Sequence, residues 1–181
     1  MPDRVSALRA VTLPDAIIRS TVWASLACYT AALFCRFGPT LRLRFAQTMW
    51  SLGAALFVAH VLSAYGFVHG FSHTDAVRVT AERTREMTGW DWGGGVYLND
   101  LMTLLWVADA IWWRMAQISY QRRPMSVELT LHGFFLFMIF NATVVFGAWP
   151  ARIYGAILCP IIMWLLYRAT RNSPRFRRAN S

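Results

Sequence analysis

Two histidines with metal-ligand spacing are the first candidates for chemistry in this chain. His69 and His73 lie four positions apart, so on a continuous helix they share one face. Imidazole nitrogens at this spacing can hold zinc, copper or iron when another ligand completes the set. His60 joins them only where the chain bends, and Asp100 can add a carboxylate oxygen. The pattern predicts a transition-metal or haem site at His69, His73, His60 and Asp100.

The same histidines have a simpler interpretation, in which they lie at the membrane interface and bond to the segment that follows them. A single haem held between His60 and His132 is not expected. The two positions fall near opposite ends of their apolar segments, which separates them by roughly 18 Å along the membrane normal. Both interpretations of the outer histidines, metal site and structural contact, stay open on the sequence alone.

A second candidate site is the intramembrane pair Asp109 and His132. Ionisable side chains inside hydrocarbon are costly, so each of them is a functional hypothesis. The two apolar segments that carry this pair are joined by a short connection, which predicts antiparallel packing and similar depths for the two side chains. The pair can relay a proton, or it can be a structural bridge that fixes the register of the two helices.

Several enzyme classes lack their motifs. The chain has no glycine-flanked serine of a hydrolase elbow and no His-Glu-x-x-His helix. Four histidines are too few for the histidine boxes of a membrane di-iron desaturase. Whether the chain is an enzyme therefore stays open, and no substrate is predicted.

The composition is that of a membrane protein. Of 181 residues, 56% are hydrophobic and only 15% are charged, against about 25% charged in a typical soluble domain. All 18 basic residues are arginine, and they flank apolar segments or gather at the carboxyl-terminal tail. This placement favours a lipid bilayer over nucleic acid as the partner of the basic residues.

The apolar segments predict an all-α integral membrane protein, a bundle of about five transmembrane helices in a single domain. A span needs roughly 20 apolar residues, and the candidates are about residues 17–37, 43–67, 96–118, 127–148 and 153–167. Between the second and third lies a long polar loop. It contains an amphipathic helix from His73 to about Thr88, capped by Ser72 and ended by Gly89, which is expected to lie outside the membrane.

The arginines also predict an orientation. With five spans, seven arginines fall on the side of the amino terminus and the long loop, mixed with six acids, whereas eleven fall on the other side with only Glu128. The positive-inside rule then places the carboxyl terminus in the cytoplasm and the amino terminus outside, in a bacterial inner membrane.

Three functions are compatible with these residues. The first is a small membrane subunit that binds a metal or haem through the outer histidines. The second is a structural accessory subunit that contacts other membrane-protein subunits. The third is a component of a proton-coupled transporter that uses Asp109 and His132.

Overall fold

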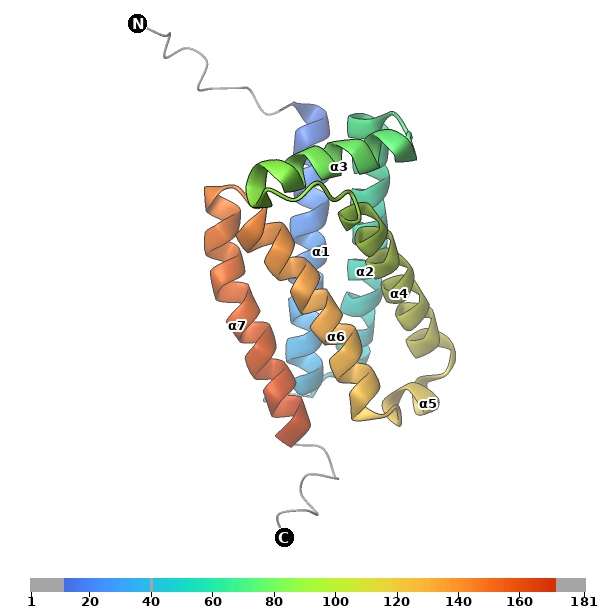
Figure 1. Ribbon diagram of the computed structural model, residues 1–181. Coiled ribbons are helices and arrows are strands. Elements are labelled where there is room, and N and C mark those ends of the chain that lie inside the picture. Colours follow the sequence, from blue (N-terminus) through green and yellow to red (C-terminus); the bar gives the residue numbers. More distant parts are fainter. Residues whose placement is uncertain (1–11, 40, 172–181) are drawn as a thin grey trace, which may run out of the picture.

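The computed structural model describes residues 12–39 and 41–171 and, over these residues, contains helices and no strand. In chain order the elements are α1 (Leu13–Phe37), α2 (Leu43–His69), α3 (His73–Thr88), α4 (Gly95–Met115), α5 (Gln117–Gln121), α6 (Met125–Phe140), the π-helical turn η2 (Asn141–Val145) and α7 (Trp149–Arg171). The five long helices α1, α2, α4, α6 and α7 form a bundle (Figure 1). Helix α3 lies across one end of it, here named the α3 end, and α5 lies at the other, the α5 end.

The long helices contact one another in a closed ring. Helix α1 packs on α2, α2 on α4, α4 on α6, α6 on α7, and α7 returns to α1. Successive long helices run in opposite directions, so the described chain begins at the α3 end and finishes at the α5 end (Figure 1). Residues from distant parts of the sequence therefore meet inside the ring.

Local signals in the sequence account for where the helices begin and end. The Thr12 hydroxyl accepts a hydrogen bond from the Asp15 amide at the start of α1, and Ser72 does the same for Asp75 at the start of α3. Gly89 ends α3 with a φ of +79°, a left-handed conformation that costs glycine little.

A glycine allows α1, α2 and α4 to approach one another closely. The Ser25 hydroxyl of α1 donates a 2.9 Å hydrogen bond to the Gly53 carbonyl of α2. A Cβ atom at Gly53 would lie only 2.8 Å from the Trp106 ring of α4. The missing side chain of Gly53 thus leaves room for the Trp106 ring between α2 and α4 and brings α1 close to α2.

Aromatic side chains fill the centre of the bundle. Tyr29, Trp50, Trp106 and Phe135 come from four different helices and are at most 1% exposed. Their ring centroids lie 5.3–6.0 Å apart, within the range of favourable aromatic contacts. This aromatic core holds α1, α2, α4 and α6 together.

Helix α3 is fastened to the end of the bundle by backbone and side-chain contacts. Ala76 and Thr84 are buried on its inner side. The Arg83 guanidinium donates a 3.0 Å hydrogen bond to the Phe146 carbonyl, between η2 and α7. Gly93 packs so closely on the Val77 carbonyl that a Cβ atom there would lie 2.5 Å from the oxygen.

The structure supports an integral membrane protein. Within the described residues, four helices are long and apolar enough to cross a membrane: α1, α2, α6 together with η2, and α7. Large apolar side chains such as Leu62, Leu104 and Ile157 point out of the bundle and are more than half exposed, as expected of surfaces that face lipid. Helix α4, which corresponds to the expected third span, is not among the four.

The helix bounds follow the sequence-based expectation with local differences. A helix covers residues 73–88, as the cap signals predict. The last helix is longer than the expected span of 153–167, because it begins at Trp149 and continues to Arg171. Pro150 follows the break between η2 and α7 and lies in the first turn of α7, where proline costs no backbone hydrogen bond.

Candidate functional site

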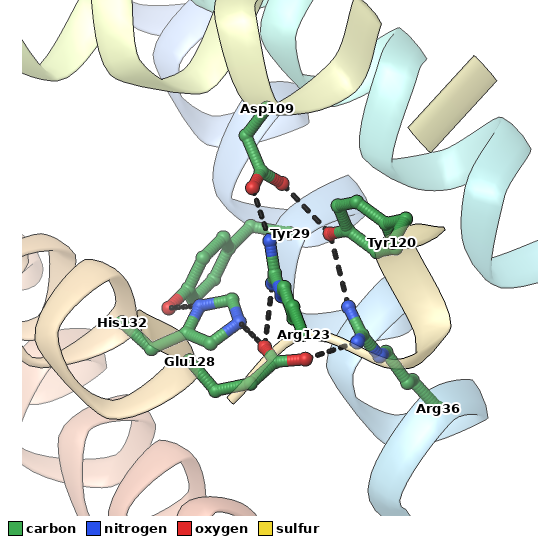
Figure 2. A network of polar contacts seen from close by, with 7 residues as sticks. All are labelled: Tyr29, Arg36, Asp109, Tyr120, Arg123, Glu128 and His132. Carbon is green, nitrogen blue, oxygen red and sulfur yellow. Dashed lines mark hydrogen bonds and ion pairs between the residues drawn. The ribbon is translucent and has the colours of Figure 1, made fainter. Parts of the chain in front are cut away.

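Seven polar side chains meet inside the bundle, toward the α5 end, and form one connected group (Figure 2). They come from α1, α4, α5, α6 and the loop before α6. We name this group the charge cluster; its members are Tyr29, Arg36, Asp109, Tyr120, Arg123, Glu128 and His132.

Arg123 lies at the centre of the charge cluster, between two carboxylates (Figure 2). Its Nη1 donates to Oδ1 of Asp109, and its Nη2 donates to Oε2 of Glu128 at 2.5 Å. The guanidinium also lies over the Tyr120 ring, 4.0 Å from the centroid, and the side chain is 0% exposed. Arg123 therefore ties α4 and α6 to the connection between them.

Arg36 adds the last turn of α1 to the same cluster. Its Nη2 donates to Oε1 of Glu128, and its Nη1 donates a 3.0 Å hydrogen bond to the Tyr120 hydroxyl. Its guanidinium stacks over the rings of Phe37, Trp113 and Tyr120 at 4.8–5.0 Å from the centroids. Planar contact on both a carboxylate and aromatic faces is a geometry that arginine supports and lysine does not.

Tyr120 links the two halves of the cluster through its hydroxyl group. The hydroxyl donates a 2.7 Å hydrogen bond to Oδ2 of Asp109 and accepts the one from Arg36. Burial of the side chain raises the pKa of Tyr120, which keeps the phenol protonated. The short helix α5 positions this side chain, and Tyr120 is its one buried residue.

His132 closes the cluster on the side of the aromatic core. Its Nδ1 lies 3.2 Å from the Tyr29 hydroxyl, and its Nε2 lies 3.4 Å from Oε2 of Glu128. Trp50 and Phe37 meet the imidazole edge-on, at 5.4 and 6.1 Å between centroids. The ring is 1% exposed, so aromatic side chains rather than solvent surround it.

The charges of the cluster balance. Two guanidinium groups, Arg36 and Arg123, face two carboxylates, Asp109 and Glu128, and all four side chains are at most 11% exposed. The cluster is neutral when His132 is uncharged. A buried ion is tolerated when it is paired and hydrogen-bonded, and here every ion has at least two partners.

Sequence near the cluster explains how it is assembled. Glu128 and His132 are four residues apart on α6, so they share one helical face. Pro124 precedes α6 in an extended conformation and places Arg123 before the first turn. Ala116 interrupts the helical path between α4 and α5, which turns Tyr120 back toward Asp109.

The structure brings Asp109 and His132 into the same cluster without a direct contact. Asp109 bonds to Arg123 and Tyr120, whereas His132 contacts Glu128 and Tyr29. The sequence predicts similar depths for the two side chains, and the observed link between them runs through Arg123 and Glu128.

The outer histidines each have a different partner. His69 Nδ1 lies 3.3 Å from Oδ2 of Asp75, and His73 Nδ1 lies 3.2 Å from the Tyr65 hydroxyl, which also donates to Asp100 at 3.3 Å. The pKa of Asp75 is lowered chiefly by the hydrogen bond from Arg78, with a smaller contribution from the hydrogen bond with His69.

His60 has its hydrogen-bond partner on α1. Its Nδ1 lies 2.9 Å from the Ile18 carbonyl of α1, within the bundle. Over the described part of the chain, no group of three or more His, Cys, Asp or Glu side chains is arranged to hold a metal ion. The four residues are thus bonded to other protein groups: His60 to Ile18, His69 to Asp75, and both His73 and Asp100 to Tyr65.

Sequence reasoning found two members of the charge cluster and missed the residues that join them. Arg36, Arg123 and Glu128 flank apolar segments, where charged residues ordinarily lie at the membrane surface. One signal was available: Glu128 lies one helical turn before His132, and it is the one acid that the orientation count placed on its side. The two tyrosines carried no signal, because tyrosine is common near membrane interfaces.

Comparison with known proteins adds no assignment: no family model, curated protein or solved structure matches the chain. Any function therefore has to be argued from the geometry of the chain itself.

Proposed function

We propose that the chain is a structural subunit of a membrane assembly, in which the charge cluster locks the α5 end of a five-span bundle. The observation that carries this proposal is the internal pairing of the cluster. Arg36 and Arg123 are matched by Asp109 and Glu128, so the site holds no unmatched ion with which to bind or transfer a substrate charge.

We propose that α4 also crosses the membrane, which brings the number of spans to five. It has 21 residues, which corresponds to about 32 Å of helix and is sufficient for the hydrocarbon core. Its two acids are the main cost of such a span. Arg123 and Tyr120 pair with Asp109, and Tyr65 donates to Asp100 near the first turn. Pairing of this kind lowers the cost of an acid at membrane depth.

The aromatic core supports a structural function over a conducting one. Trp50, Trp106 and Phe135 pack directly on one another between the helices, and Trp50 and Phe135 also contact His132. Dense aromatic packing on the inner side of the cluster favours a rigid core over a water-filled path.

The surroundings of the proposed subunit follow from its surface. The exposed apolar faces suit lipid or the spans of partner subunits. We retain the orientation given by the arginines, with α3 outside the membrane on the outer face and the α5 end in the cytoplasm of a bacterial cell. The metal or haem function is not part of the proposal, since the outer histidines are engaged by Asp75, Tyr65 and Ile18.

One observation favours a second function, that of a proton-coupled transporter component. The Tyr29 hydroxyl contacts Nδ1 of His132 at 3.2 Å, and Nε2 of the same ring lies 3.4 Å from the Glu128 carboxylate, so three groups that can exchange protons lie in one line. A proton relay would need this line to change its protonation during turnover, whereas a structural lock would keep it fixed.

Proton flux into liposomes that contain the purified chain separates the two functions. The structural proposal expects flux equal to that of empty liposomes, both for the unchanged protein and for Glu128→Gln. It also expects Glu128→Gln to lower the free energy of unfolding by about 3–5 kcal/mol, because Arg36 and Arg123 lose a shared partner.

The matched control for that experiment is Glu86→Gln. Glu86 is an exposed acid on α3, and its replacement should change stability by less than about 0.5 kcal/mol. Flux from the unchanged protein that is lost in a folded Glu128→Gln or His132→Gln variant would refute the structural proposal in favour of the transporter.

A further inference from the structure

A second basic feature lies at the α5 end, next to the charge cluster, with which it shares Arg123. The turn from α4 through α5 to the start of α6 borders an open hollow of about 960 Å³. Its lining includes Arg114 at the end of α4, Gln117 in α5, and Arg122 between α5 and α6. The volume falls in the range of about 300–1,000 Å³ that is typical of small-molecule sites.

Three arginines line the hollow. Arg123 is paired within the charge cluster, whereas Arg114 and Arg122 have no carboxylate at ion-pair distance among the described residues. Arg114 donates a 3.0 Å hydrogen bond to the Ser51 hydroxyl of α2, which is a neutral partner. Neither Arg114 nor Arg122 forms an ion pair within the described residues, and both are exposed. Within the described ranges, the charges of Arg114 and Arg122 therefore border the hollow without a counter-ion.

Apolar side chains complete the rim of the hollow. Met115 and Ile118 are 82% and 73% exposed, and Trp112 lines the hollow beside them. Exposed apolar residues next to arginine, at the end of a membrane helix, are typical of the level of the lipid headgroups, where charged groups meet phosphate and apolar groups meet acyl chains.

We propose that this hollow binds the headgroup of an anionic phospholipid, with Arg114 and Arg122 contacting the phosphate and Met115 and Ile118 contacting the acyl chains. Arginine matches phosphate well, since its guanidinium presents two parallel donors to the phosphate oxygens. The apolar rim favours a lipid over free phosphate, because inorganic phosphate makes no favourable contact with the exposed apolar side chains beside the arginines. The proposal does not depend on the structural function argued above.

Native mass spectrometry of the full chain, delipidated in a neutral detergent, tests the site directly. The titrants are phosphatidylglycerol, phosphatidylcholine and inorganic phosphate. We expect tight binding of one phosphatidylglycerol and much weaker binding of phosphatidylcholine. The double variant Arg114→Gln/Arg122→Gln should weaken phosphatidylglycerol binding by about tenfold or more and leave phosphatidylcholine binding unchanged.

A matched control uses the same change of charge at the same end of the bundle. Arg42 and Arg44 are exposed arginines at the start of α2, outside the hollow. Arg42→Gln/Arg44→Gln should keep the affinity for phosphatidylglycerol. Ser51→Ala should keep it as well, because it removes the intramolecular bond of Arg114 and leaves its charge. Arg114→Lys/Arg122→Lys, which retains both charges, provides a readout that survives if the glutamine pair fails to fold.

Three results would overturn the proposal. The first is equal affinity of the unchanged protein for phosphatidylglycerol and phosphatidylcholine. The second is an unchanged affinity for phosphatidylglycerol in the glutamine pair, or a loss as large in the control pair. The third is displacement of phosphatidylglycerol by inorganic phosphate at an equal concentration, which would assign the hollow to a soluble phosphate compound.

Discussion

Adjacent arginines at positions 122 and 123 have opposite environments, and this contrast defines the chemistry of the molecule at the scale of residues. Arg123 is enclosed by Asp109, Glu128 and the Tyr120 ring. Arg122 is exposed, beside the hollow at the α5 end. A one-residue step along the chain therefore separates a charge that holds helices together from one that is available to a ligand.

The two arginines give a paired prediction. Arg123→Gln should lower the free energy of unfolding by about 3–5 kcal/mol, because it leaves two carboxylates buried without their shared partner. Arg122→Gln should change it by less than about 0.5 kcal/mol. Equilibrium unfolding of both variants in the same detergent measures the difference. Similar losses in the two variants would show that the cluster does not hold the fold.

The sequence identifies the cluster residues that lie inside apolar segments and does not identify those at the ends of the segments. Asp109 and His132 stand out because hydrocarbon penalises them. Arg36 and Arg123 do not, because an arginine at the end of a span is ordinary and its direction depends on tertiary contacts. Only the three-dimensional path of α5 and the loop after it reveals that Arg123 turns inward.

At the scale of elements, the contact between η2 and α7 depends on a glycine. A Cβ atom at Gly155 would lie 2.2 Å from the Thr143 hydroxyl of η2. That hydroxyl already donates a hydrogen bond to the Ile139 carbonyl. The π-helical turn and the last helix are therefore packed against each other without spare volume.

This packing predicts opposite effects for the same substitution at two glycines. Gly155→Ala should destabilise the protein by about 1–3 kcal/mol through overpacking. Gly133→Ala, in the middle of α6 with no atom within 4 Å of the added Cβ, should be neutral or stabilise by up to about 1 kcal/mol, because alanine favours the helix. Thermal unfolding of both variants provides the comparison, and a stabilising Gly155→Ala would contradict the contact described.

Helix α3 should respond to acid through Asp75. The pKa of Asp75 is lowered by hydrogen bonds from Arg78 and then His69, so its carboxylate stabilises the helix start above the ordinary pKa. That contribution is lost as the pH falls through the lowered value. The protection factors of the α3 amides, which correct for the intrinsic pH dependence of exchange, should therefore fall below about pH 4. In Asp75→Asn the exchange should be faster at neutral pH and should lack this step, whereas Glu86→Gln should retain it.

The sequence predicts the elements more completely than their arrangement. Periodicity, caps and apolar length are local properties, so α3 and the apolar helices are predictable within a few residues. The closed ring of five helices and the inward path of α5 depend on contacts between residues as far apart as Arg36 and Glu128. No local pattern encodes such pairings.

The whole molecule has chemically different ends, and the proposed orientation can be measured. In a background without Cys28, Cys35 and Cys159, we expect an impermeant thiol reagent to label Glu86→Cys and not Gln121→Cys in intact cells. Both positions are exposed, one on α3 and the other on α5. Labelling should reach both positions after the cells are opened. The reverse pattern in intact cells would invert the orientation.

Neutrality of the charge cluster also has a consequence for biogenesis. Arg36 enters the membrane with the first helix, yet its carboxylate partner Glu128 is made 92 residues later. Asp109 likewise pairs with a residue made later, Arg123, and the cluster closes only when α6 packs against α4 and its Glu128 reaches Arg36. A chain interrupted before α6 would hold Arg36 and Arg123 with Asp109 as their one carboxylate, and so would carry an arginine without its partner. An unpaired ion of this kind distinguishes an incompletely synthesised chain from the folded protein, because it is costly inside a membrane.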